Sequence, residues 1–191
     1  TNVLALVILF VYSHSIRLLH DRVGVPIVMA IPTGLMIYIA LGYFAAQITP
    51  RDETTFWISV VVVFLFGLGV FFGTKSRAER AHRTSLPVFV KLPIILVVVA
   101  LLVVIKGNLG GFASLFPLVS VVGSYEARYS LWMMSRTVPM LMITLLPLLV
   151  TTHLTQQAFG LGGGLLLGWA VFFVLLVPIT MWQWRHWPDP N

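Results

Sequence analysis

The sequence has no cysteine and few charged residues. Of its 191 residues, 9% are charged and 59% are hydrophobic, whereas a soluble domain carries roughly 25% charged residues. Without cysteine, these residues can form no disulfide bond, thiolate metal site or cysteine nucleophile. The low charge, together with a mean hydropathy of +0.98, excludes an ordinary soluble domain and indicates an integral membrane protein.

Acidic residues are missing from the interior of the long apolar runs. The acids all fall in connections or at the ends of runs, and they are Asp21, Asp52, Glu53, Glu79, Glu126 and Asp189. Proton-driven and ion-driven transporters often hold a titrating group inside a span. The distribution of acids therefore disfavours a proton-coupled mechanism.

Catalytic constellations are also lacking. Ser114, Ser120 and Ser124 in the fifth apolar run have no nearby His–acid pair, and no glycine-rich loop follows a strand to bind phosphate. His14 is the histidine that lies well inside an apolar run, and no second histidine is placed to share a metal with it. We therefore expect a non-enzymatic protein without metal or cofactor. His14 is then a structural residue or, as the alternative, the single ligand of a pigment.

Seven apolar runs are long enough, or nearly so, to cross a bilayer core of ~30 Å as helices. They cover residues 3–19, 24–46, 55–73, 87–105, 109–125, 137–153 and 159–182. The first run lacks the basic start and the cleavage pattern of a signal peptide, so we take it as a span. This pattern predicts an all-α polytopic bundle of six or seven spans, with residues 1–191 forming one membrane domain. Glycine and proline are dense in the fifth and sixth runs, so a re-entrant hairpin could replace two passes.

The longest polar stretch, residues 74–91, is strongly basic. Its charged residues are Lys75, Arg77, Arg80, Arg83 and Lys91 against Glu79. Lys and Arg in short loops mark the cytoplasmic side. With seven passes, the other basic residues on that side are Arg17, Arg22, Arg128, Arg136 and Arg185, which leaves Arg51 and Lys106 outside. We predict a multi-pass membrane protein with its N-terminus out and its C-terminus in the cytoplasm. The net charge of +6 reflects this membrane-side bias rather than nucleic-acid binding.

Two runs share a glycine and proline pattern. The second run contains Gly24, Pro26, Pro32 and Gly34, and the fifth is entered through Gly107, Gly110 and Gly111 before Pro117. The two would enter the membrane from opposite sides, as in an inverted repeat of three plus three spans followed by one helix. Interrupted helices expose backbone groups that bind solutes. One hypothesis is therefore a transporter of a small solute or lipid, with Pro32, Gly34, Gly111 and Pro117 at its site, and structural kinks are the alternative reading.

Small residues also line helix faces. Gly160, Gly164 and Gly168 recur at four-residue spacing, and Gly69 and Gly73 repeat the spacing. Such faces let another helix approach closely, either within the chain or from another subunit. The leading functional hypothesis from the sequence is an accessory or structural subunit of a membrane complex, with lipids, other subunits or copies of itself as partners.

The segment 124–136, SYEARYSLWMMSR, is the most chemically varied patch. It is typical of an interfacial connector with a local ion pair. As the alternative, Arg128 and Arg136 contact anionic lipid headgroups.

Residues 110–147 resemble the GlpM family of small bacterial inner-membrane proteins. The resemblance rests on the order of Gly110, Phe116, Pro117, Tyr125, Arg136, Thr137 and Pro147. It implies a multi-spanning protein of the bacterial inner membrane, and it supplies no catalytic residue. The spans before residue 110 have no counterpart in the short family form.

Overall fold

A computed structural model of the protein describes residues 3–50, 52–74 and 86–185, and all elements in this part are helical. In chain order they are α1 (Ala5–Arg17), a π-helical turn η1 (Leu18–Arg22), α2 (Ile27–Ile48), α3 (Glu53–Gly73), α4 (Val88–Leu109), a 3-10 segment η2 (Gly110–Leu115), α5 (Leu118–Glu126) and α6 (Leu131–Arg185). Most of the predicted basic loop, including Lys75 to Arg83, lies outside the described residues. The prediction of an all-α protein is confirmed.

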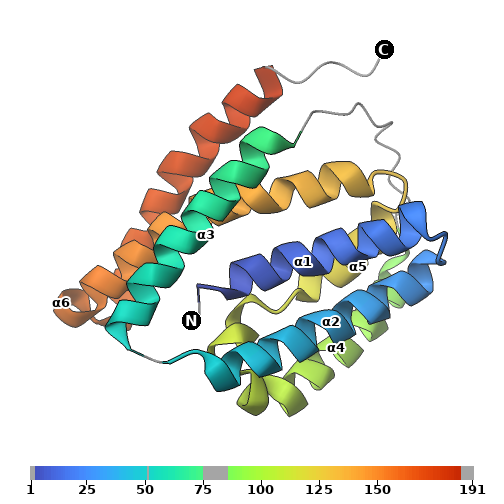
Figure 1. Ribbon diagram of the computed structural model, residues 1–191, viewed down its shortest axis with the longest axis horizontal. Helices are drawn as coiled ribbons and strands as arrows, with labels where there is room; N and C mark the ends of the chain where they lie inside the picture. Colours follow the sequence, from blue (N-terminus) through green and yellow to red (C-terminus); the bar gives the residue numbers. More distant parts are fainter. Residues whose placement is uncertain (1–2, 51, 75–85, 186–191) are drawn as a thin grey trace.

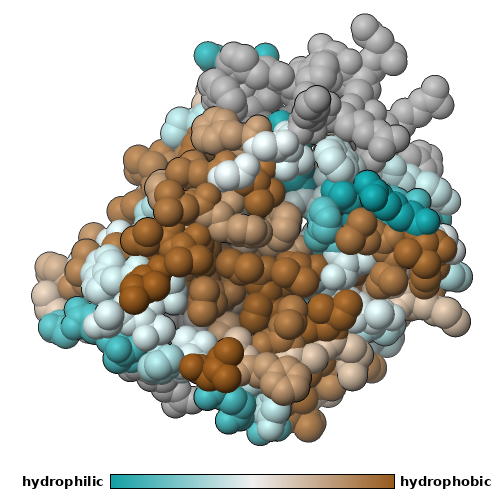
Figure 2. All heavy atoms as spheres, in the orientation of Figure 1, coloured by the Kyte–Doolittle hydropathy of each residue, from teal (hydrophilic) through white to brown (hydrophobic). Residues whose placement is uncertain are grey.

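Four helical stretches are long and apolar enough to cross a membrane. They are Ile27–Ile48, Glu53–Gly73, Val88–Leu115 and Leu131–Met181. Figure 2 shows apolar atoms across the middle of one face, with hydrophilic atoms gathered toward its edges. Such a distribution fits a protein whose middle lies in the hydrocarbon core of a bilayer and whose two ends lie in water.

The first predicted span is shorter than expected. α1 has 13 residues, which extend about 20 Å as an α-helix, and η1 then continues the chain as a π-helical turn. α1 packs against both α2 and α6, and Leu6 and Tyr12 are fully buried. α1 therefore lies between α2 and α6 (Figure 1), although it is not among the four stretches that are long and apolar enough to span.

The fifth predicted span, residues 109–125, is not one continuous helix. The chain changes from α4 to the 3-10 segment η2, becomes non-helical at Phe116 and Pro117, and resumes as the nine-residue helix α5. Proline disfavours helical conformation in the residue before it, and Phe116 accordingly has φ −59° and ψ 132°. The expected interruption in the second run is absent, because α2 continues through Pro32.

The sixth and seventh predicted spans belong to one element with a sharp bend. α6 includes the predicted connection at residues 154–158 as helix and departs from helical geometry at Gly160, where φ is 69° and ψ is 173°. Glycine adopts a positive φ without the steric cost that other residues meet. Gly160 is therefore the hinge of a helical hairpin whose two arms diverge beyond the turn (Figure 1).

Small residues set the closest helix contacts in the core. A Cβ atom at Gly34 of α2 would lie 2.7 Å from Cγ1 of Ile16, and one at Gly42 would lie 2.9 Å from Cδ2 of Leu109. These glycines therefore let α2 approach α1 on one side and the end of α4 on the other. Tyr38, also on α2, donates a hydrogen bond of 2.9 Å to the carbonyl of Phe112, which fixes η2 against the bundle.

Candidate functional site

A cavity lies at the end of the bundle where α2 ends and α3 begins. Its volume is about 590 Å³. It is lined by Val3, Ala46, Thr49, Pro50, Asp52, Glu53, Thr55, Phe56, Ser59, Gly110, Gly111, Phe112, His153 and Gln157. We call it the Asp52 cavity. Its walls come from five parts of the chain, so the fold builds it from residues far apart in sequence.

Polar groups line this cavity from several directions. Asp52 and Glu53 are exposed at its edge, whereas Ser59 is only 5% exposed and its side chain forms no hydrogen bond within the described residues. His153 of α6 stacks on Phe56 of α3 with ring centroids 4.1 Å apart. The stacked rings join α3 to α6 and fix the imidazole in the cavity wall.

Asp52 is held by the start of α3. Its Oδ1 accepts a hydrogen bond of 3.3 Å from the backbone N–H of Thr55, which makes it the N-cap of the helix. A hydrogen bond with the side chain of Thr55 is the largest cause that lowers the pKa of the Asp52 carboxyl below its usual value, and the backbone N–H of Thr55 acts in the same direction. The carboxylate therefore stays ionised at neutral pH.

A second, smaller cavity of about 150 Å³ lies where α1 and α3 end and α6 begins. It is lined by Phe10, His14, Arg17, Val70, Thr74, Trp132, Ser135, Arg136 and Pro139, and we call it the Arg17 cavity. The guanidinium carbon of Arg17 lies 4.2 Å from the ring centroid of Trp132. Its Nη1 donates a hydrogen bond of 3.4 Å to Ser135 Oγ. The Arg17 cavity is therefore basic and aromatic, in contrast to the acidic Asp52 cavity.

The two cavities lie along the same three helices. Val3, which lies just before α1, is at the Asp52 cavity, and Arg17, at the end of α1, is at the Arg17 cavity. In α3 the order is Ser59 and then Val70. α6 runs in the opposite sense, from Ser135 to His153. Ser59 and Val70 are 11 positions apart in one helix, which corresponds to about 16 Å.

Between the cavities, the three helices meet in a set of buried apolar side chains. This apolar layer consists of Leu6 from α1, Val63 from α3, and Val138, Met142 and Leu146 from α6. Leu6, Val63 and Met142 have no exposed surface, and a Cβ atom at Gly67 would lie 3.2 Å from Cβ of Met142. The close approach of α3 and α6 at this level separates the two cavities.

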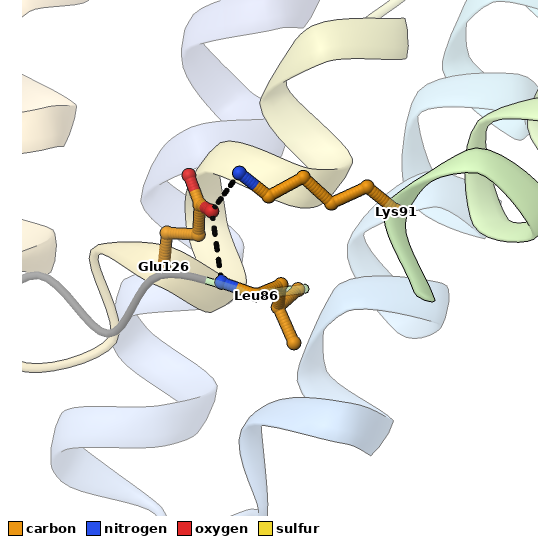
Figure 3. Close-up of polar contacts among 3 residues, drawn as sticks. All are labelled: Leu86, Lys91 and Glu126. Carbon is orange, nitrogen blue, oxygen red and sulfur yellow. Dashed lines mark hydrogen bonds and ion pairs between the residues drawn. The ribbon is translucent and has the colours of Figure 1, made fainter. Parts of the chain in front are cut away.

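An ion pair joins the two ends of the α4–α5 segment. Lys91 Nζ lies 2.6 Å from Glu126 Oε1, and the same oxygen accepts a hydrogen bond of 3.2 Å from the backbone N–H of Leu86 (Figure 3). Because Lys91 is near the start of α4 and Glu126 ends α5, the chain from Gly110 to Glu126 returns along α4. The interrupted segment thus runs from one end of the bundle to the other.

The four residues predicted for a solute site do not line one cavity. Gly111 lines the Asp52 cavity, and Gly34 is buried against Ile16. Pro117 is buried at the break between η2 and α5, and Pro32 is exposed on α2. Gly111 is therefore the member of the set that the fold brings to the larger cavity.

The five predicted packing glycines also have different surroundings. Gly164 and Gly168 lie against the first arm of α6, since Cβ atoms there would lie 3.2 Å from the Thr152 carbonyl oxygen and 2.8 Å from that of Leu148. Gly160 is the hinge. At Gly69 and Gly73 of α3 a Cβ atom would meet nothing within 4 Å among the described residues.

The two arginines that the sequence singles out lie at the same end of the bundle. The guanidinium carbon of Arg128 lies 4.9 Å from the Tyr125 ring centroid and 4.8 Å from that of Tyr129. A hydrogen bond with Tyr129 is the main cause that raises the pKa of Arg128, so this side chain remains charged. Arg136 lines the Arg17 cavity beside His14, which stacks on Phe10.

Sequence reasoning missed the residues that give the Asp52 cavity its polarity. In the sequence, Asp52 and Glu53 fall in a short connection between two apolar runs, and Ser59 is a polar residue within the apolar run 55–73. The one sequence feature that points to Ser59 is its four-residue spacing from Val63 and Gly67, which places the three residues on one face of a helix. Within the described residues, no group of three or more His, Asp or Glu side chains is arranged to hold a metal.

These observations define a class: an all-helical membrane protein with an acidic and a basic cavity at opposite ends of one helix interface. No protein-family model matches the sequence, and no curated protein or solved structure is significantly similar to it. The resemblance of residues 110–147 to the GlpM family therefore stays a prediction.

Proposed function

We propose that the chain is a small transporter, with a solute path along the interface of α1, α3 and α6. The observation that carries this proposal is the order of features along all three helices: cavity, apolar layer, cavity. A transporter must keep the two sides of the membrane separated, and a path that is closed in its middle by packed side chains meets this requirement. Hydrophobic constrictions also close channels by excluding water.

The topology that goes with this function is the seven-pass arrangement. Two contacts support it. The Lys91–Glu126 pair brings the end of α5 back to the start of α4, and the Arg17–Trp132 contact brings the start of α6 to the end of α1. With the basic residues 75–83 on the cytoplasmic side, the Asp52 cavity faces outward and the Arg17 cavity faces inward. We further propose the bacterial inner membrane as its location.

The transport proposal is tested by changing the polarity of the apolar layer at nearly constant volume. Val63→Thr places a hydroxyl in the layer, and we expect it to raise the flux of small polar solutes through the purified protein in liposomes, because the constriction then admits water more readily. The measurement is efflux of a radiolabelled amine and a radiolabelled polyol. The matched control is Val61→Thr, since Val61 is 55% exposed on the same helix. Equal flux from both variants and the native protein would reject the path.

A second candidate, an accessory subunit of a membrane complex, is favoured by the surroundings of Gly69 and Gly73. Both lie on α3 with open space where a side chain would be, so a helix of another subunit could pack there closely. We expect Gly69→Leu to dissociate an assembly that is seen on a native gel, while Gly162→Leu, at another glycine with open space, leaves it intact. An assembly that survives Gly69→Leu argues against this role.

A further inference from the structure

We propose that the Asp52 cavity binds an ammonium group, carried either by a small free amine or by an amine-bearing lipid headgroup. This inference rests on the proposed transport function in treating the cavity as a binding site, and it adds the chemical class of the ligand.

The charges at the cavity favour a cation. Asp52 and Glu53 supply two carboxylates, and no Lys or Arg is among the described residues that line it. Lys106 is on the nearby last turn of α4 but is exposed and does not line the cavity. An ammonium group near two carboxylates gains Coulomb energy that a neutral solute does not.

The helix ends add to the same preference. α2 ends at Ile48 and α4 ends at Leu109, and the residues that follow them, Thr49 and Gly110, both line the cavity. A helix C-terminus carries partial negative charge. α3 presents an N-terminus of the opposite sign, but the Asp52 carboxylate caps it.

A buried hydroxyl supplies a directional partner. Ser59 is more than nine-tenths buried, lines the cavity, and forms no hydrogen bond within the described residues. An ammonium group carries three donors when primary, so it can reach the Ser59 oxygen and a carboxylate at the same time.

Size also agrees with this class. The volume of about 590 Å³ is within the range of ligand cavities, ~300–1,000 Å³, and it is large enough for an amine with a short polar chain. The lining combines apolar side chains, including Val3, Phe56 and Phe112, with polar ones. Such a cavity suits an amphipathic ligand whose charged end is its ammonium group.

The test measures binding of ethanolamine by isothermal titration calorimetry to the full chain in nanodiscs of phosphatidylglycerol, a lipid without an amine. We expect ethanolamine to bind and ethylene glycol, which lacks the charge, not to bind. Asp52→Asn and Glu53→Gln should each weaken binding by roughly tenfold or more. Asparagine is itself a good N-cap, so Asp52→Asn removes the charge and keeps the start of α3. Asp21→Asn is the matched control, because Asp21 is an exposed acid in η1, away from the cavity.

The second arm identifies the source of the ammonium group. Nanodiscs with equal parts of phosphatidylethanolamine and phosphatidylglycerol are analysed by native mass spectrometry. Selective retention of phosphatidylethanolamine that is lost in the Asp52→Asn, Glu53→Gln double variant assigns the site to a lipid headgroup, even where free ethanolamine does not bind. Retention of neither ligand, or binding that the double variant leaves unchanged, overturns the proposal. Binding as expected without any flux would instead reject transport and leave the site in place.

Discussion

At the residue scale, Asp52 has two tasks that depend on the same charge. Its carboxylate caps α3 through Thr55 and contributes negative charge to the cavity edge. The negative charge at the cavity edge requires the ionised form, and the ionised form also makes Asp52 the stronger cap of α3. The lowered pKa of Asp52 therefore extends the pH range over which the helix start and the cavity keep their properties.

We predict that acid weakens the start of α3. The folded-state pKa of Asp52 is below that of the unfolded chain, which is about 3.9. The stabilisation by the carboxylate is therefore complete above that value and is lost as the pH falls through the folded-state pKa. Thermal unfolding in detergent micelles, followed by circular dichroism from pH 7 to pH 3, should show a lower midpoint at acid pH.

The control for this prediction is Asp52→Asn, because the asparagine side chain caps α3 but does not titrate. This variant should lose less of its midpoint between pH 5 and pH 3 than the native chain. If the thermal midpoints of both proteins fall by the same amount between pH 5 and pH 3, the group whose protonation destabilises the protein is not Asp52.

Ser59 illustrates what residue-level reading of the sequence cannot reach. It stands among valines and aromatic residues in residues 55–73, where the helix itself is predictable from composition. Its role depends on which face of α3 turns toward α1 and α6, and a helix that is apolar all round gives no such direction. Only the packing of three helices places Ser59 in a cavity wall.

At the element scale, the hairpin of α6 depends on glycine at the positions where its two arms touch. A Cβ atom at Gly168 would lie 2.5 Å from Thr152 Oγ1 and 2.8 Å from the Leu148 carbonyl oxygen. Because one of these neighbours is backbone, the arms must move apart to admit even a methyl group. The glycine spacing thus serves contact within the chain at this point.

We predict that Gly168→Ala destabilises the protein by about 1–3 kcal/mol, the usual cost of overpacking a tight contact. Gly162→Ala is the matched control, since a Cβ atom there meets nothing within 4 Å among the described residues. The free energies of unfolding are compared by titration with SDS in mixed micelles. A Gly168→Ala variant as stable as Gly162→Ala would mean that the arms do not pack as described.

The elements that the sequence predicts well are those whose apolar runs are long and free of turn residues. The runs at 24–46 and 55–73 correspond closely to α2 and α3. The run at 109–125 failed as a single helix because Gly110, with φ 52°, and Pro117 divide it, and hydropathy does not register backbone geometry. The chain bends at Gly160, beyond the predicted connection at residues 154–158, because the polar residues 151–157 remain helical. Packing against other parts of the protein can stabilise a helix whose sequence alone does not favour it.

At the scale of the whole molecule, the two cavities have opposite electrostatic character. Acids line one end and arginines the other, and the sequence predicts this asymmetry in part through its basic loops. It does not predict that both cavities lie on one three-helix interface. That arrangement depends on α1 lying between α2 and α6. These contacts join residues far apart in the sequence, and the periodicity of a single helix does not predict them.

Because the chain has no cysteine, single cysteines report the access of water along this interface directly. Ser59→Cys, Val63→Cys and Ser135→Cys lie at the Asp52 cavity, the apolar layer and the Arg17 cavity, and each is treated with a membrane-impermeant charged thiol reagent in intact cells and in inverted vesicles. We predict labelling of Ser59→Cys from outside only, of Ser135→Cys from inside only, and of Val63→Cys from neither side. Labelling of Ser59→Cys and Ser135→Cys from the same side, or free labelling of Val63→Cys from both sides, would contradict a path with opposite openings and a closed centre.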